Sequence, residues 1–289
     1  MTIVRKIRSR AKVGMGLLAR DRLMALGTFI LIALILIGAF GPLLPMHDPT
    51  AIGAGPRLSP PTLEFLLGTD ELGRSCLPRI ISGILVTIVI AGAAVVLTAL
   101  IGIFLGLIAA YFGGLTDVFV ARAADVLFAF PAIILGLLIA SVFGPGVWAV
   151  ITVIVAATLP LFIRVIRSVA ISIATREFVI AARVAGASPL RIMLVHLLPN
   201  VAGTAIIQLT YALSIGMLIE SGLSFLGLGT QPPYPSLGSL LQLGAMYLTI
   251  APWLVFPPAL IILMAILSVN LVGDGLRDAI DPLKGRMLR

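Results

Sequence analysis

The amino-acid sequence predicts an all-α polytopic membrane protein with six transmembrane helices and both termini in the cytoplasm. Of its 289 residues, 60% are hydrophobic and only 11% are charged, whereas a soluble domain carries about 25% charged residues. The apolar residues form long continuous runs. Because backbone groups must be paired internally in lipid, such runs predict helices, while the strands of a membrane barrel are short alternating segments.

Six apolar runs are long enough for the roughly 20 residues with which a helix crosses ~30 Å of hydrocarbon. The first, Leu23–Leu44, is longer than a signal-peptide core and no small-residue cleavage site follows it, so we expect an uncleaved span. The second lies within Ile80–Tyr111 and exceeds the bilayer thickness, which predicts a tilted or projecting helix. The other four are about Val118–Phe143, Val147–Ile163, Val201–Ile219 and Pro252–Val272.

The lysines and arginines predict the orientation. With the N-terminus inside, the cytoplasmic segments contain 17 of these residues and the external segments contain three, as the positive-inside rule requires. Topology therefore explains the net charge of +8 better than nucleic-acid binding does. The predicted parts are a basic cytoplasmic segment (1–22), a first span (23–44), an external loop (45–79), a core of five helices (80–273) and a cytoplasmic tail (274–289). The core includes a cytoplasmic loop at 164–200 and an external segment at 221–251.

The cytoplasmic stretch Thr175–Asn200 has the pattern of two short helices joined at a glycine. Glu177–Ala185 is rich in alanine, the best helix former, and its acid sits at the favourable end of the helix dipole. Gly186 can end this helix in a left-handed conformation, and Ser188 can cap the next one. On these grounds the stretch is either a contact surface for another protein or an amphipathic helix at the membrane interface without a partner.

The external segment Ser221–Ala251 is long and contains no charged residue, which predicts a short helix or scoop packed on the outer mouth of the bundle. Glu220 lies beside it, where the carboxylate could bind a substrate amine or anchor the scoop. Near the cytoplasmic side, Arg122 and Asp125 have the spacing of an ion pair within one helix.

The stretch around Gly186 resembles the "EAA" loop of the permeases of ABC importers, whose consensus is Glu-Ala-Ala, three residues, Gly, nine residues and Ile-x-Leu-Pro. Ala181 and Ala182 match the two alanines, and Leu198 and Pro199 match the final pair.

Two positions depart from that consensus, since Ile180 replaces the acid and His196 replaces the isoleucine. The peptide/nickel branch of the family carries its acid three residues earlier, where this chain has Glu177. We refer to Glu177–Pro199 as the coupling segment.

Three further stretches resemble the "C"-type subunit of the dipeptide/oligopeptide/nickel branch. They are LGTDELGRS (67–75), ESGLSFLGLGTQPPYPSLG (220–238) and LVGDGLRDAIDP (271–282). One departure is Ser75, which stands where an acid is usual.

The resemblance implies a type I importer permease that forms half of a path for dipeptides or oligopeptides across the bacterial inner membrane, with nickel or another small solute as alternatives. It implies a heterodimer with a homologous permease, two ATP-binding subunits and an extracytoplasmic binding protein. The implied coupling residues are Glu177, Ala181, Ala182, Arg183, Gly186, Ala187, Ser188, Leu198 and Pro199. Candidates for the external mouth or gate are Glu220, Ser221, Phe225, Leu226 and Gln231.

The sequence predicts a transport subunit rather than an enzyme. It contains no G-x-x-x-x-G-K-[ST] loop, so ATP and Mg²⁺ are expected on partner subunits and no cofactor in this chain. The only histidines are His47 and His196 and no H-E-x-x-H motif occurs, so neither a metal site nor a catalytic residue is predicted. The rival is an ion-coupled secondary transporter, which would be expected to show inverted repeats and paired intramembrane acids.

Overall fold

The computed structural model describes residues 21–280, and their regular structure is helical. The elements are α2 (Arg22–Phe40), η1 (Gly41–Leu43), α3 (Cys76–Phe112), α4 (Gly114–Phe128), α5 (Ala132–Phe143), α6 (Val147–Ala174), α7 (Glu177–Val184), α8 (Pro189–Arg191), η2 (Ile192–Leu197), α9 (Leu198–Phe225), α10 (Leu237–Met246), η3 (Pro252–Leu254) and α11 (Phe256–Ile280). Most of the predicted basic segment 1–22, and the tail beyond residue 280, lie outside the described residues.

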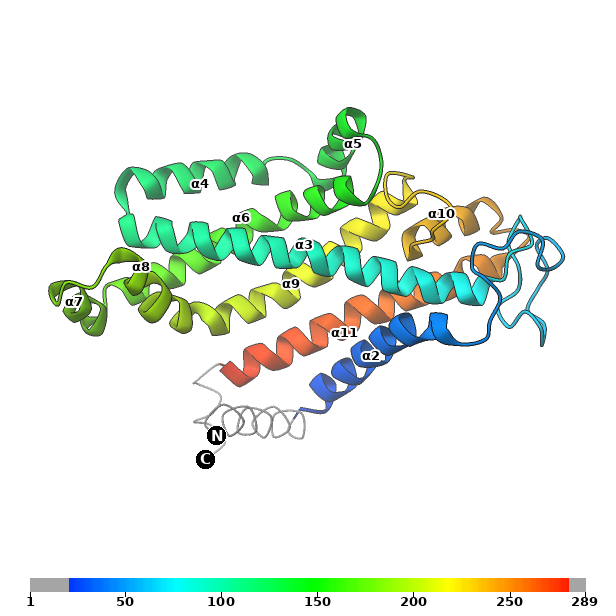
Figure 1. Ribbon diagram of the computed structural model, residues 1–289, viewed down its shortest axis with the longest axis horizontal. Coiled ribbons are helices and arrows are strands. Elements are labelled where there is room, and N and C mark those ends of the chain that lie inside the picture. The colour runs from blue at the N-terminus through cyan, green and yellow to red at the C-terminus, as the bar shows by residue number, and fades with distance from the viewer. Residues whose placement is uncertain (1–20, 281–289) are drawn as a thin grey trace.

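The helices form an elongated bundle with different elements at its two ends (Figure 1). One end, which we call the α7 end, carries α7 and α8. The other, which we call the loop end, carries the connection between α2 and α3 together with α10. Helix α3 packs most extensively against α6, α2 lies along α11, and α9 contacts α3, α6 and α11.

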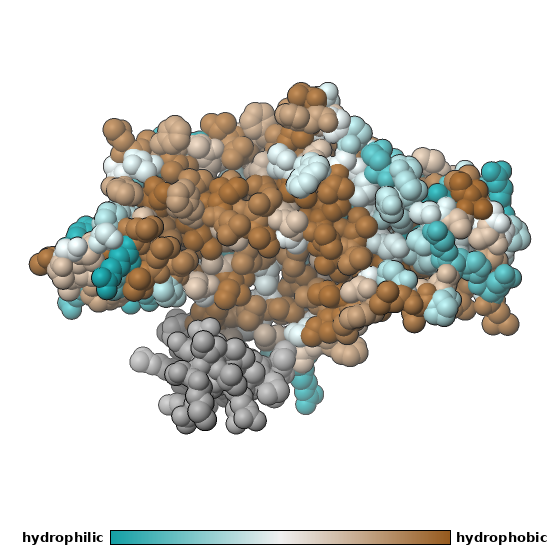
Figure 2. Space-filling model, in the orientation of Figure 1, coloured by the Kyte–Doolittle hydropathy of each residue, from teal (hydrophilic) through white to brown (hydrophobic). Residues whose placement is uncertain are grey.

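The surface of the bundle is divided in the same way. Figure 2 shows apolar residues over the middle of the visible face and hydrophilic residues gathered toward its ends. Many large apolar side chains of the bundle are exposed, among them Phe29, Phe104 and Leu263. This distribution is typical of a helical bundle whose middle is surrounded by lipid.

The six predicted spans correspond to five continuous helices and one bent pair. The predicted third span, about Val118–Phe143, corresponds to the two helices α4 and α5, which meet at 88°. The break falls at Ala129–Pro131, with Pro131 as the N-cap of α5 and its backbone extended. Proline disfavours the helical conformation of the residue before it, so α4 ends there and the chain turns.

Four spans are longer than predicted, namely those of α3, α6, α9 and α11. Helix α3 has 37 residues, or about 55 Å at ~1.5 Å per residue, which is longer than the ~30 Å thickness of the hydrocarbon. Helix α6 continues past Ile163 to Ala174. Its extension is tied to α4, since Arg164 pairs with Asp125 at 3.1 Å and Arg167 pairs with Asp117 through two hydrogen bonds.

The predicted pair of Arg122 with Asp125 is present at 3.8 Å. Both side chains are largely exposed, at 80% and 49%, so this pair contributes little to stability. The Asp125 carboxylate also pairs with Arg164 of α6, and this second pair joins α4 to α6.

Glycines allow α2 to approach α11 closely. A Cβ atom on Gly27 would lie 2.6 Å from Leu271 Cβ and 2.8 Å from the Ser268 carbonyl oxygen, whereas a Cβ on Gly92 of α3 would meet nothing within 4 Å.

We therefore expect opposite effects from two Gly→Ala substitutions. Gly27→Ala should lower the free energy of unfolding by about 1–3 kcal/mol, because the helices must separate. Gly92→Ala should raise it by up to about 1 kcal/mol, because alanine favours the helix. Unfolding of the purified chain in mixed detergent micelles measures both, and a stabilising Gly27→Ala would contradict the packing described here.

Candidate functional site

The corner of the coupling segment is a helix end closed by two backbone hydrogen bonds. The Gly186 N–H donates to the Arg183 carbonyl at 3.1 Å, and the Ala187 N–H donates to the Ala182 carbonyl at 3.0 Å. Gly186 has φ +81°. This is the Schellman arrangement, in which glycine takes the left-handed position after the helix. Of the coupling residues predicted from the sequence, this corner brings together Ala182, Arg183, Gly186 and Ala187.

The second half of the coupling segment continues directly into a long span. The Ser188 hydroxyl accepts from the Arg191 N–H at 3.4 Å, and Pro189 occupies the first helical position, as predicted from the sequence. A π-helical stretch, Ile192–Leu197, then joins α8 to α9. Leu198 and Pro199 begin α9 beyond this stretch, so α8, the π-helical stretch and α9 form one apolar helical run from Pro189 to Phe225.

One side of α7 is fixed to the bundle. Val179 has no exposed surface and packs in a cluster with Ile173, Ile192 and Leu197. The Arg183 guanidinium lies 5.1 Å from the centre of the Tyr111 ring at the end of α3, which adds a cation–π contact. A displacement of α7 would therefore be passed to α3, α6 and α9.

The other side of α7, together with Leu190 of α8, carries exposed apolar side chains, of which Phe178 lies with its ring centre 6.3 Å from that of His196. Phe178, Ile180 and Leu190 are 42%, 50% and 62% exposed, and Val184 is 84% exposed. Ala181 and Gly186 are exposed among them. Exposed apolar groups at the hydrophilic end of a bundle are typical of a protein contact surface. We call Phe178, Ile180, Val184 and Leu190 the α7 patch. Glu177 lies exposed in the first turn of α7.

The predicted mouth residues divide into a buried and an exposed group. Glu220 has no exposed surface, and its carboxylate accepts from the Ser224 hydroxyl at 2.8 Å and the Ser221 hydroxyl at 3.4 Å. Phe225, Leu226 and Gln231 are exposed. The segment after α9 includes a short helix, α10, as predicted. Its start is tied to α3 by the Leu237 N–H, which donates to the Thr87 hydroxyl at 3.2 Å.

A buried charge cluster holds the loop end together. Asp70, Arg74 and Arg79 are 1%, 8% and 6% exposed. The Asp70 carboxylate accepts from Arg74 Nε at 2.6 Å and lies 3.4 Å from Arg79 Nε. It also accepts the backbone N–H groups of Leu72 and Arg74, both at 2.9 Å. One carboxylate thus organises the turn and pairs with two guanidinium groups, and Glu71 supplies a second acid to Arg74 at 3.1 Å.

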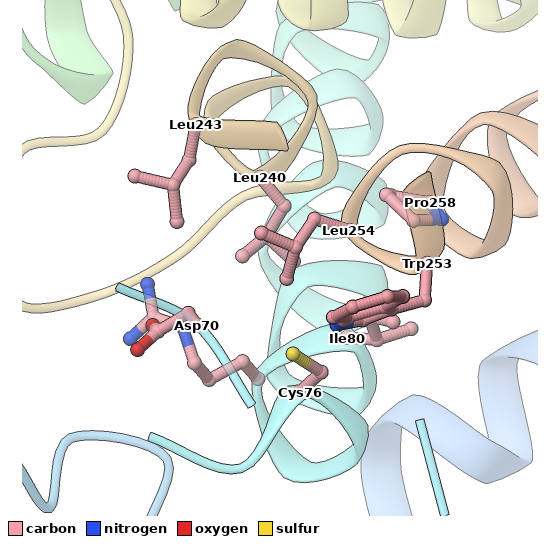
Figure 3. Close-up of a pocket in the computed structure, with 9 residues that line it drawn as sticks. Asp70, Cys76, Ile80, Leu240, Leu243, Trp253, Leu254 and Pro258 are labelled. Atoms are coloured by element: carbon pink, nitrogen blue, oxygen red, sulfur yellow. Dashed lines mark ion pairs between the residues drawn. The ribbon is translucent and has the colours of Figure 1, made fainter. Parts of the chain in front are cut away.

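Apolar residues cover this cluster. Figure 3 shows side chains from α10 and from the start of the last span gathered around Asp70 and Cys76. They line a cavity of only about 10 Å³, room for about one water. The cover lowers the local dielectric and strengthens the ion pairs, and it makes an unpaired charge costly. Just outside it, burial and the neighbouring Asp70 carboxylate raise the pKa of Glu71.

A second cavity, of about 350 Å³, opens between α6, α9 and α11. Its lining is partly polar, with Gln208 and Tyr211 from α9 and Asn270, Asp274 and Arg277 from α11. Polar side chains on facing helices within a mostly apolar bundle are typical of a solute path or a polar helix contact.

The sequence contains a signal for one of these features but not for the others. The exposed apolar residues of the α7 patch could be found from their place in a basic cytoplasmic segment. The cluster around Asp70 could not, because Arg79 reaches Asp70 across a turn whose shape the sequence does not reveal.

A family model described as "Binding-protein-dependent transport system inner membrane component" matches residues 102–286. The chain is 38% identical over 265 residues to the di/tripeptide transport system permease protein DppC of Pseudomonas aeruginosa, covering 89% of this chain and 88% of the relative. It is 35% identical over 263 residues to the dipeptide transport system permease protein DppC of Haemophilus influenzae, covering 89% of each. It is 34% identical over 265 residues to the oligopeptide transport system permease protein OppC of Bacillus subtilis, covering 91% and 86%.

The structure is also similar to a chain solved in inward-facing conformations of the MetNI methionine ABC transporter. The TM-score is 0.56 and the identity 19%, and the match covers 70% of this chain and 96% of that chain. At this identity the likeness concerns the fold.

Proposed function

Because this chain belongs to the family of binding-protein-dependent transport system inner membrane components, we propose that it is the permease subunit that forms half of a peptide path in an ATP-driven importer. The predicted type I permease fold is confirmed by the structural likeness. Peptides are the proposed cargo because the three relatives described above are named for di/tripeptide, dipeptide and oligopeptide transport. Chains of this family are transport subunits, not enzymes.

The exposed α7 patch is the main support for the proposed role of this segment in coupling. A rigid helix with one buried side and one exposed apolar side can bind a partner and pass its movement to the bundle. We assign that partner as one of two ATP-binding subunits, which supply ATP and Mg²⁺. When ATP draws these subunits together, the coupling segment moves as a lever and tilts α9, and the path changes its side of access.

The polar cavity between α6, α9 and α11 supports a second partner. A homologous permease facing Gln208, Tyr211 and Asn270 would enclose a path lined by amide and hydroxyl groups, which can hydrogen-bond a peptide backbone. We infer a heterodimer, with α7 and both termini in the cytoplasm and the loop end outside the bacterial inner membrane. A binding protein then delivers cargo to the loop end, where Phe225, Leu226 and Gln231 are exposed.

Uptake by cells with and without this chain tests the proposal. Loss of the chain should abolish accumulation of labelled dialanine and trialanine, and expression of the chain should restore it. Nickel accumulation measured in the same cells is the control for the alternative cargo. Unchanged peptide uptake together with lost nickel uptake would replace the peptide assignment by the nickel one. Peptide uptake that continued without the ATP-binding subunits would favour a secondary transporter.

A further inference from the structure

The acid Glu220 is fully buried near the loop end of α9, which ends at Phe225. A buried carboxylate is costly unless a cation or several hydrogen-bond donors compensate its charge. None of the ion pairs between described residues includes Glu220. An acid retained at such a position in an apolar bundle indicates a functional role.

Hydroxyl groups from three helices surround the Glu220 carboxylate. Ser224 and Ser221 of α9 donate to it at 2.8 Å and 3.4 Å. The carboxylate also interacts with the hydroxyl of Thr87 in α3 and with that of Ser236, the N-cap of α10. One side chain thus connects the loop end of α9 with α3 and with the start of α10.

The hydroxyls of Thr87 and Ser236 have the polarity that a carboxylate requires. The Thr87 oxygen accepts the Leu237 N–H at 3.2 Å, and the Ser236 oxygen accepts the Ser239 N–H at 3.3 Å. A hydroxyl carries one hydrogen besides its lone pairs, and in both residues this hydrogen is available to Glu220. The carboxylate is therefore the shared acceptor that fixes the start of α10.

The start of α10 is also packed closely against α9 and α3. A Cβ on Gly238 of α10 would lie 2.4 Å from the Ser221 carbonyl oxygen and 2.7 Å from Ser224 Cβ. A Cβ on Gly83 of α3 would lie 3.2 Å from the Leu237 nitrogen. A shift of the loop end of α9 relative to α3 must therefore move α10 or break the hydrogen bonds around the carboxylate.

Helix α9 runs from the coupling segment to α10 (Figure 1). We propose that Glu220 is a positioning residue of the transport cycle, which makes α10 and the outer opening of the path follow the movement of α9. The inference rests on the proposed ATP-driven import and adds the joint at the loop end. The same joint transmits the docking of the binding protein back to the coupling segment, because coupling between two binding sites is reciprocal.

The test compares two variants of Ser236 that keep the N-cap. Aspartate and asparagine both cap a helix as serine does and have nearly the same size, but only asparagine can donate to Glu220. The dissociation constant of the dialanine-loaded binding protein is measured on the complete transporter in proteoliposomes, with and without a non-hydrolysable ATP analogue. The two constants should differ about fivefold or more in the wild type and in Ser236→Asn, and less than about twofold in Ser236→Asp.

Exchanging the donor and the acceptor gives a second readout. Glu220→Gln combined with Ser236→Asp places an amide donor on α9 and a carboxylate on α10, and it should restore the difference to about fivefold. A purely local defect at each position would instead produce losses that add. Ser268→Ala removes a buried hydroxyl whose hydrogen bond stays within α11, and it should leave the difference unchanged.

Co-purification of the ATP-binding subunits checks assembly. If Ser236→Asp fails to assemble, Glu220→Leu decides alone, because it removes the acceptor and keeps the cap. A wild-type difference in either assembled variant, or additive losses in the exchanged pair, would overturn the inference. Equal constants in a wild-type transporter that takes up peptide would overturn it too. Absence of peptide uptake by the wild type would instead reject the proposed function itself.

Discussion

Replacing Asp70 with asparagine is expected to lower the free energy of unfolding by about 3–5 kcal/mol. The substitution leaves Arg74 and Arg79 buried without their shared carboxylate. Removing one partner of a buried ion pair destabilises the fold by this amount, because the other charge stays buried without compensation. Apolar cover from α10 and the last span excludes the water that could replace it. Unfolding of the purified chain in mixed detergent micelles measures the loss.

The matched control for this experiment is Glu64→Gln, which changes an exposed acid in the same loop. We expect it to change the free energy of unfolding by no more than about 0.5 kcal/mol. Equal stability of Asp70→Asn and the control would contradict the buried cluster at the loop end.

The second large effect is expected at the corner of the coupling segment. Gly186→Val should reduce peptide uptake per ATP hydrolysed about tenfold, because a β-branched residue at φ +81° is strained by at least ~1–2 kcal/mol. A Cβ at this position would meet nothing within 4 Å, so the effect arises from the backbone rather than from a clash. Uptake and hydrolysis measured in the same proteoliposomes give the ratio.

Gly186→Asn is the control, because asparagine tolerates the left-handed conformation and should retain most of the coupling. If both variants transported as much peptide per ATP hydrolysed as the wild type, the corner would not act as a rigid joint.

Local chemistry made several elements predictable. Gly186 indicates a helix end because glycine reaches the left-handed region without strain, and Ser188 with Pro189 has the pattern of a helix start. The apolar runs gave the spans, because lipid requires about 20 apolar residues in each. At these positions a few neighbouring residues decide the conformation.

Other features depend on contacts between distant residues. The break before Pro131 is not predictable from the sequence, because an apolar run on both sides of a proline is compatible with a kinked span or with two helices. The π-helical stretch Ile192–Leu197 has no composition that separates it from an α-helix. A cavity of about 270 Å³ at the loop end is lined by both Glu71 and Thr230, which requires two loops to meet, and no local sequence pattern predicts that meeting.

The contact partner of the α7 patch tests the central claim most directly. A photo-crosslinking amino acid is placed at Val184, which is 84% exposed on α7, and separately at Leu63, which is 98% exposed at the loop end. In the assembled transporter, position 184 should crosslink to an ATP-binding subunit and position 63 should not. Crosslinking of position 184 to no second protein, or its labelling from outside the cell, would contradict the account.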